Sequence, residues 1–313
     1  TFKGEKGDLT MDFFPLKIHE DTARVQFKQA LSMMSCFEKW FGPFPWYKDG
    51  FKLVEAPHLG MEHQSAVAYG NQYKNGYLGR DLSRTGRGLK WDFIIVHESA
   101  HEWWGNNVSM DDQSDMWIHE SFANYSENIY TECLEGKQAG AEYVIGSRAA
   151  VRNDRPVVGV RGVANEGSGD MYYKGGNMLH TMRTILDNDE QWRALLRGAQ
   201  STFARKTISG ATLQAYFNKE SGVDFSKVFE QYLYTTMIPR LEYRIDNGNV
   251  QYRWANVVDG FNMPVDVALP EAPTAWRRIR PSAIWQTMAG GSMKAGDPLV
   301  VRNDFYVTAA LVP

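Results

Sequence analysis

Two histidines flank a glutamate in the segment Val96 to Glu102. His97 and His101 are four residues apart, so on a helix both imidazoles lie on one face and can reach a single metal ion. Glu98 follows the first histidine and would face a water molecule held on that metal. The spacing His-Glu-x-x-His is therefore typical of a zinc-hydrolase site.

Glu120 can supply the third ligand that such a site needs. It follows His101 by nineteen residues, inside a segment from Met116 to Ala123 that is typical of a helix start. Two imidazoles and one carboxylate leave the fourth position of a zinc ion open, as catalysis requires. Zinc lowers the pKa of bound water and polarises a carbonyl, which suits hydrolysis of an amide or ester. Glu98 can take the proton from that water and pass it to the leaving nitrogen.

A surface charge pattern is the alternative explanation of the five-residue motif, because short motifs also occur by chance. The neighbouring residues are mostly apolar, which predicts a buried helix on which charged groups need partners. These neighbours are Phe93, Ile94, Val96, Ala100 and Trp104. With Glu120 at a suitable spacing, we favour a site for one zinc ion.

Tyr172 is a candidate donor for the oxyanion that develops during hydrolysis. It lies between an irregular stretch, residues 152 to 170, and a predicted helix, from where a side chain can project into a cleft. From its position alone, a packing role with a satisfied hydroxyl is the more common alternative.

These residues resemble the zinc aminopeptidases of the aminopeptidase N and leukotriene hydrolase type, which are gluzincins. The family pattern of HExxH, eighteen residues and Glu is met by the three ligands and Glu98. The family motif Trp-Phe-Gly-Asn corresponds to Trp103-Trp104-Gly105-Asn106, and Trp-x-x-Glu-Gly-Phe-Ala corresponds to Trp117-Ile118-His119-Glu120-Ser121-Phe122-Ala123. The family motif Tyr-x-Lys-Gly corresponds to Tyr172-Tyr173-Lys174-Gly175, and this resemblance assigns the oxyanion role to Tyr172.

The same resemblance implies where the substrate binds. The family motif Gly-x-Met-Glu-Asn corresponds to Leu59-Gly60-Met61-Glu62-His63, with departures at Leu59 and His63. It implies that Glu62 binds the free α-amine of a peptide and that backbone around Gly60 runs beside it. A carboxylate fixed near the metal pairs with an ammonium and limits cleavage to the first peptide bond. Met61 would line the pocket for the first side chain, or equally belong to the core.

Apolar periodicity predicts the elements that position these groups. A helix is expected from Asp21 to Phe41, ended by Gly42-Pro43, and the metal helix from about Trp91 to Trp104. Short strands are expected at residues 51–54 and 65–69, and further helices at 116–134, 139–151, 174–188, 190–204, 209–221 and 225–236. The fold class is therefore α+β. By resemblance, residues 1–240 form a thermolysin-like domain with a small mixed sheet and a helical bundle.

Residues 241–313 are expected to form a separate, small β-sandwich-like domain. Asn247-Gly248 between two alternating runs is a strong hairpin signal. Further strands are expected at 265–269, 283–287, 299–301 and 305–311. The resemblance also implies an N-terminal β domain and a C-terminal helical domain, and neither is expected in this sequence.

Composition limits the partners. The net charge of -3 comes from 34 basic and 37 acidic residues without a basic run, which argues against nucleic acid. No apolar stretch approaches the ~20 residues that span a bilayer. Cys36 and Cys133 suggest no disulfide framework, and Cys36 is expected to be a buried thiol. No signal-peptide pattern is visible, so cytoplasm and bacterial periplasm both stay open, as does the oligomeric state.

Asp115 and Glu127 are candidates to orient the ligand histidines, with a helix-surface role as the equal alternative. Glu102 and His119 adjoin ligands but point elsewhere, so both are expected to be structural. His180 is expected to be packed or exposed rather than a ligand.

The sequence thus predicts a zinc-dependent aminopeptidase acting on peptides with a free N terminus. One alternative is a gluzincin endopeptidase, which would cleave blocked and free peptides alike. The other is a peptide-binding scaffold that keeps the fold without catalysis, although this chain retains the ligands and Glu98.

Overall fold

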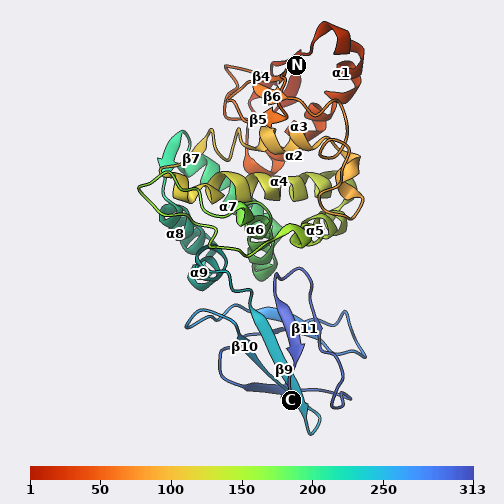
Figure 1. Cartoon of the computed structure of the whole chain (residues 1–313), viewed down its shortest axis with the longest axis vertical. Helices are drawn as coiled ribbons and strands as arrows, with labels where there is room; N and C mark the ends of the chain where they lie inside the picture. Colours follow the sequence, from red (N-terminus) through yellow and green to blue (C-terminus); the bar gives the residue numbers. More distant parts are fainter.

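The computed structural model describes residues 1–313 and has helices between two regions of strands (Figure 1). The N terminus lies at one end of the molecule and the C terminus at the other. One continuous cluster of 69 buried hydrophobic residues runs through both regions, from Leu9 to Tyr306. None of the helices has the length and apolar character that crossing a membrane would require.

A four-stranded sheet lies near the N terminus, in the order β3-β4-β6-β5. Its strands are β3 (Met11–Phe14), β4 (Phe51–Glu55), β6 (Val67–Tyr69) and β5 (Gly60–Met61), preceded by a hairpin of β1 (Phe2–Gly4) and β2 (Gly7–Leu9). β3, β4 and β6 run parallel, whereas β5 pairs antiparallel with β6. The sheet is mixed, as predicted, and β5 forms one of its edges.

The helices form the middle of the molecule. They are α1 (Glu20–Gln26), α2 (Gln29–Phe41), α3 (Phe93–Ala100), α4 (Trp117–Glu135), α5 (Lys137–Gly146), α6 (Tyr173–Leu186), α7 (Asp189–Thr202), α8 (Gly210–Ser221) and α9 (Ser226–Tyr234). A small parallel pair, β7 (Val108–Met110) with β8 (Lys206–Ile208), joins the segment after α3 to the segment after α7. The long helix α4 crosses the centre of this region (Figure 1).

Two predicted helices differ from the structure. The helix expected from Asp21 to Phe41 is broken into α1 and α2 at Phe27 and Lys28. Phe27 is buried there and packs its ring edge-on to Tyr69 of β6, at 4.9 Å between centroids. The metal helix is shorter than expected, because α3 ends at Ala100 and residues 101–103 form a turn.

Strands occupy the chain from Arg240 to Leu311. They form two sheets, β13-β10-β9-β15 and β12-β11-β14. The strands are β9 (Arg240–Asp246), β10 (Asn249–Ala255), β11 (Val265–Ala268), β12 (Arg277–Ile279), β13 (Gln286–Ala289), β14 (Val300–Val301) and β15 (Thr308–Leu311). The predicted hairpin is confirmed, with Asn247 and Gly248 both at positive φ, as a type I′ turn requires.

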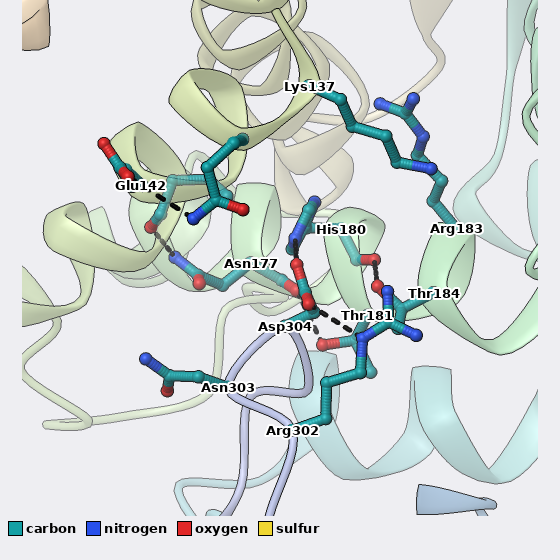
Figure 2. A network of polar contacts seen from close by, with 12 residues as sticks. Lys137, Glu142, Asn177, His180, Thr181, Arg183, Thr184, Arg302, Asn303 and Asp304 are labelled. Carbon is teal, nitrogen blue, oxygen red and sulfur yellow. Dashed lines mark hydrogen bonds and ion pairs between the residues drawn. The ribbon is translucent and has the colours of Figure 1, made fainter. Parts of the chain in front are cut away.

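Polar contacts join α6 to the loop between β14 and β15 (Figure 2). Nε2 of His180 lies 2.8 Å from Oδ1 of Asp304, and the Arg302 guanidinium donates to the other Asp304 oxygen at 2.9 Å. The Thr181 hydroxyl accepts the backbone N–H of Tyr306 at 3.0 Å. His180 is therefore a packed residue, as expected, and contacts this loop.

Cys36 of α2 and Cys133 of α4 form a disulfide across a sequence separation of 97 residues. This bond corrects the prediction that Cys36 is a buried free thiol. The two helices pack side by side and bring the Cα atoms to 6.1 Å, a normal distance for a disulfide. Nothing in the spacing of two cysteines along the chain could have indicated that packing.

Candidate metal centre

Helix α3 carries His97 and places His101 at its C-cap. Its N-cap is Asp92, whose carboxylate accepts the backbone N–H groups of Ile94 and Ile95 at 3.1 and 3.3 Å. This cap fixes the start of the helix, so His97 and His101 lie one turn apart with both rings buried. Helix α4 packs against α3 and carries Glu120 in its first turn.

The three predicted ligands converge. Oε2 of Glu120 lies 3.4 Å from Nε2 of His97 and 3.5 Å from Nε2 of His101. Two ligand atoms on one tetrahedral zinc ion, each about 2.0–2.1 Å from the metal, are separated by roughly 3.3–3.4 Å. The spacing therefore fits one ion between these atoms.

Glu120 also shows the electrostatic character of a ligand. Its Oε2 is buried and has no hydrogen-bond partner in the protein, so a cation would complete its coordination. Burial alone would raise the pKa of the Glu120 carboxyl. The neighbouring imidazoles of His101 and His97 outweigh that effect and hold the pKa well below its usual value, so the carboxylate is ionised.

The remaining ring nitrogens of the two histidines have partners that hold them in position. Nδ1 of His97 lies 2.8 Å from Oε1 of Glu127, whose other oxygen accepts the Tyr143 hydroxyl at 2.5 Å. Nδ1 of His101 donates to the Trp104 carbonyl at 2.9 Å. Each contact fixes a tautomer in which Nε2 is free for a metal.

Asp115, the other candidate for orienting a histidine, is engaged elsewhere. Its carboxylate accepts the Trp117 indole N–H at 3.2 Å and the Gly210 backbone N–H at 2.9 Å, and it pairs with Arg161. It therefore ties the start of α4 to the start of α8. Of the two candidates, only Glu127 contacts a ligand histidine.

Glu98 lies against Gly60 of the edge strand β5. It is largely buried, and burial raises the pKa of its carboxyl although the two histidines oppose this. A Cβ atom added to Gly60 would stand 2.9 Å from Oε1 of Glu98 and 2.9 Å from Cγ2 of Ile94. The absence of a side chain at Gly60 therefore allows β5 to pass directly over the carboxylate.

Glu62 reaches the same centre. The Glu62 carboxylate, the Glu98 carboxylate and the His101 ring each offer a possible ligand atom. These atoms all lie within 4.8 Å of one another. The Asn106 side chain donates to the Glu62 carbonyl at 2.9 Å. Glu102 accepts the backbone N–H of Ser65 at 2.7 Å, so the loop after β5 is held on both sides of His63.

Asn106 and Glu102 thus hold the loop that carries Glu62, a connection that the sequence interpretation missed. Glu102 was expected to be structural, and its contacts are structural. Burial raises its pKa to about 8. Asn106 was visible only as the last residue of the matched Trp-Trp-Gly-Asn segment.

Tyr172 stands at the start of α6 with its ring centroid 5.9 Å from that of His97. Burial and the nearby carboxylates, chiefly that of Glu120, raise the pKa of its hydroxyl, which therefore stays protonated and can donate. Met61 is exposed, so it does not belong to the core. His119 is structural, as expected, since its Nε2 accepts the Met110 backbone N–H at 3.0 Å.

Comparison with known proteins gives the same family over most of the chain. The peptidase family M1 domain matches residues 25–232. Aminopeptidase N of Lactobacillus helveticus is 27% identical over 208 residues, which cover 60% of this chain and 24% of that protein. Endoplasmic reticulum aminopeptidase 1 of Mus musculus is 23% identical over 193 residues, covering 57% and 20%. The chain thus spans about a quarter or less of the length of these curated relatives.

Solved structures share the fold. Aminopeptidase A of Legionella pneumophila, in complex with aspartic acid, superimposes with a TM-score of 0.73 at 13% identity, covering 99% of this chain and 37% of that one. A two-domain M1 zinc metallopeptidase bound to L-tryptophan gives a TM-score of 0.60 at 20% identity, covering 76% and 51%. Taken with the sequence match, these likenesses confirm the resemblance, and the family implies zinc at the site. The chain belongs to peptidase family M1, the aminopeptidase N family.

Proposed function

We propose that this chain is the catalytic part of a zinc-dependent aminopeptidase that hydrolyses the N-terminal peptide bond of peptides. The observation that carries the proposal is the convergence of His97, His101 and Glu120 on one buried position beside Glu98 and Glu62. A metal site with this ligand set and an adjacent free carboxylate suits amide hydrolysis.

One zinc ion would be held by Nε2 of His97, Nε2 of His101 and the Glu120 carboxylate. When bound, zinc supplies a more acidic water and polarises the scissile carbonyl. Glu98 accepts the proton of the attacking water and then delivers it to the leaving nitrogen. A raised pKa suits this exchange, because the carboxyl must both take and give a proton near neutral pH. The Tyr172 hydroxyl donates to the oxygen on which negative charge develops.

Glu62 would set the position of cleavage. Its carboxylate would pair with the substrate ammonium, and its closeness to Glu98 and His101 would bring the first peptide bond to the metal. Gly60 lets the substrate backbone approach β5, and the exposed Met61 borders the first side chain. A substrate whose N terminus is blocked has no ammonium group, so it would leave Glu62 without a partner and bind more weakly.

The domain division is part of the same proposal. Residues 1–240 would form the thermolysin-like catalytic domain, and residues 241–313 a β-sandwich-like domain behind it. All nine α-helices precede Arg240 and two sheets follow it, which supports the division. The polar contacts of Figure 2 link the two parts.

The test compares free and blocked substrates. The zinc-loaded full chain is assayed with a panel of aminoacyl-aminomethylcoumarins and with the same compounds carrying an acetylated N terminus. The kcat/KM values of the two sets are compared. We expect blocking to lower kcat/KM by about 10- to 100-fold, the value of one charge-assisted contact. Glu62→Ala should give a similar loss on the free substrates and almost none on the blocked ones.

Glu98→Gln tests the chemistry. Loss of a general base should lower kcat by about 10²- to 10⁴-fold while one zinc per chain is still bound. Glu190→Gln, on the exposed face of α7, is the matched control and should behave as the unaltered chain. Equal cleavage of blocked and free compounds would favour an endopeptidase. Full activity of Glu98→Gln, or no bound zinc, would refute the mechanism.

A further inference from the structure

We propose that Ser121 is a positioning residue for Tyr172, and that its hydroxyl fixes the turn that presents the tyrosine to the metal centre. This inference rests on the proposed function, in which Tyr172 stabilises the oxyanion. Ser121 directly follows the ligand Glu120 on α4 and is completely buried. It is therefore placed to connect one metal ligand to the group that acts on the substrate.

The connection is a single hydrogen bond between two elements. The Ser121 hydroxyl donates to the carbonyl of Met171 at 2.7 Å. Met171 ends the short 3-10 helix η5 (Gly169–Met171) and immediately precedes Tyr172. The hydroxyl is a side-chain donor to that carbonyl from a different helix. Removal of the hydroxyl would take this donor away from the residue before the tyrosine.

Helices α4 and α6 pack closely around the Ser121 hydroxyl. A Cβ atom added to Gly175 of α6 would stand 1.9 Å from Oγ and 2.6 Å from Cβ of Ser121. Gly175 lies almost one helical turn after Tyr172, so the missing side chain of Gly175 lets α6 approach α4 at this level. The family motif quoted above has glycine where this chain has Ser121. The serine therefore adds a contact that the motif does not require.

A second contact holds the other side of the turn. The buried carboxylate of Asp170 accepts the backbone N–H groups of Arg152 and Asn153 at 2.8 and 2.6 Å. This contact ties the turn to the irregular segment before it, whereas Ser121 ties it to the helix that carries Glu120. Of these two contacts, the Ser121 contact is the one that reaches the helix carrying Glu120.

The test uses Ser121→Ala in the zinc-loaded full chain, with Ser126→Ala as the matched control. Ser126 lies on the same helix, is equally buried, and its hydroxyl donates to the Phe122 carbonyl at 2.7 Å. Its contact stays within α4 and does not reach the turn. We expect Ser121→Ala to lower kcat about tenfold with KM and zinc content unchanged, as for a misplaced catalytic group. Ser126→Ala should retain the original kcat.

Two further measurements separate positioning from a general structural effect. In a Tyr172→Phe background, Ser121→Ala should cause no additional loss of kcat, because the group that it positions is already gone. Amide hydrogen exchange of residues 169–173 should become faster in Ser121→Ala and stay unchanged in Ser126→Ala.

An additive loss in the double variant, or an unaltered kcat of Ser121→Ala, would overturn the inference while leaving the proposed function intact. If Tyr172→Phe itself keeps the original kcat, the oxyanion role fails and the positioning role fails with it. Zinc content and the kcat of Glu98→Gln show in that case whether the metal mechanism still stands.

Discussion

Substitution of Gly60 by alanine tests how closely strand β5 is fitted over Glu98, the proposed general base. The added Cβ would stand 2.9 Å from Oε1 and 3.0 Å from Cγ of Glu98, whereas ordinary contact begins at 3.4 Å. It would also stand 2.9 Å from Cγ2 of Ile94, a buried residue of the rigid helix α3. Strand β5 is hydrogen-bonded to β6, so the ends of the Glu98 and Ile94 side chains are the parts that yield.

The magnitude follows from that displacement. Relief of the contact requires Glu98 to move by about 0.5 Å, and a 1 Å misplacement in an active site can cost ~100-fold in rate. We therefore expect Gly60→Ala to lower kcat about tenfold, equivalent to about 1.4 kcal/mol of activation free energy. KM should change less, because β5 keeps its place in the sheet.

The assay is steady-state hydrolysis of the best aminoacyl-aminomethylcoumarin, together with zinc content and thermal unfolding. Gly169→Ala is the control, because a Cβ atom there would meet nothing within 4 Å although the residue lies near the site. In a Glu98→Gln background, Gly60→Ala should have no further effect on kcat. An unchanged kcat of Gly60→Ala, with zinc fully bound, would refute the close fit of β5 over Glu98.

Three other predictions concern the metal shell and stability. Glu127→Gln should weaken the contact that orients His97 and so raise the zinc dissociation constant about 10- to 100-fold, as measured by competition with a chelator. An unchanged dissociation constant would contradict that role of Glu127. Reduction of the Cys36–Cys133 disulfide, or replacement of both cysteines by serine, should lower the free energy of unfolding by up to about 4.7 kcal/mol, because the bond closes a loop of 97 residues. Denaturant unfolding measures this difference, and equal stability would contradict the bond. Burial opposes ionisation of Asp189, but its two basic partners bring its pKa down to about 2. Its stabilisation is thus present above the unfolded pKa near 4 and lost as pH falls toward 2. Asp189→Asn should cost less than about 1 kcal/mol at pH 7 and nothing at pH 2, and a constant difference would contradict the assignment.

The closeness of the proposed ligands His97 and His101 was predictable because helical spacing places them on one face. The helix that carries His97, the helix around Glu120 and the hairpin at Asn247-Gly248 all follow from local signals. The ends of α3 were not predictable in the same way. The chain leaves the helix after Ala100, and the His101 ring donates to the carbonyl of Trp104, a contact that periodicity does not encode.

Contacts between distant segments account for what the sequence could not indicate. The approach of Gly60 to Glu98 depends on how β5 packs on α3, and the disulfide depends on how α2 packs on α4. Strand β12 was missed because its residues, Arg277 to Ile279, are mostly exposed and charged and show no alternation. Glu127 could be singled out as a candidate, yet only its place opposite His97 distinguishes it from Asp115.

The loop that carries Glu62 is tied to the segment that directly follows His101, through Asn106 and Glu102. If Glu62 binds the substrate amine as proposed, amine binding and metal retention should be thermodynamically coupled, because stabilisation of the loop would also stabilise the segment that follows His101. Coupling of this kind is reciprocal, so an amine that occupies Glu62 should slow the release of zinc to a chelator. Loss of zinc should equally weaken binding of the amine. The enzyme would then hold its metal most firmly while its substrate is bound.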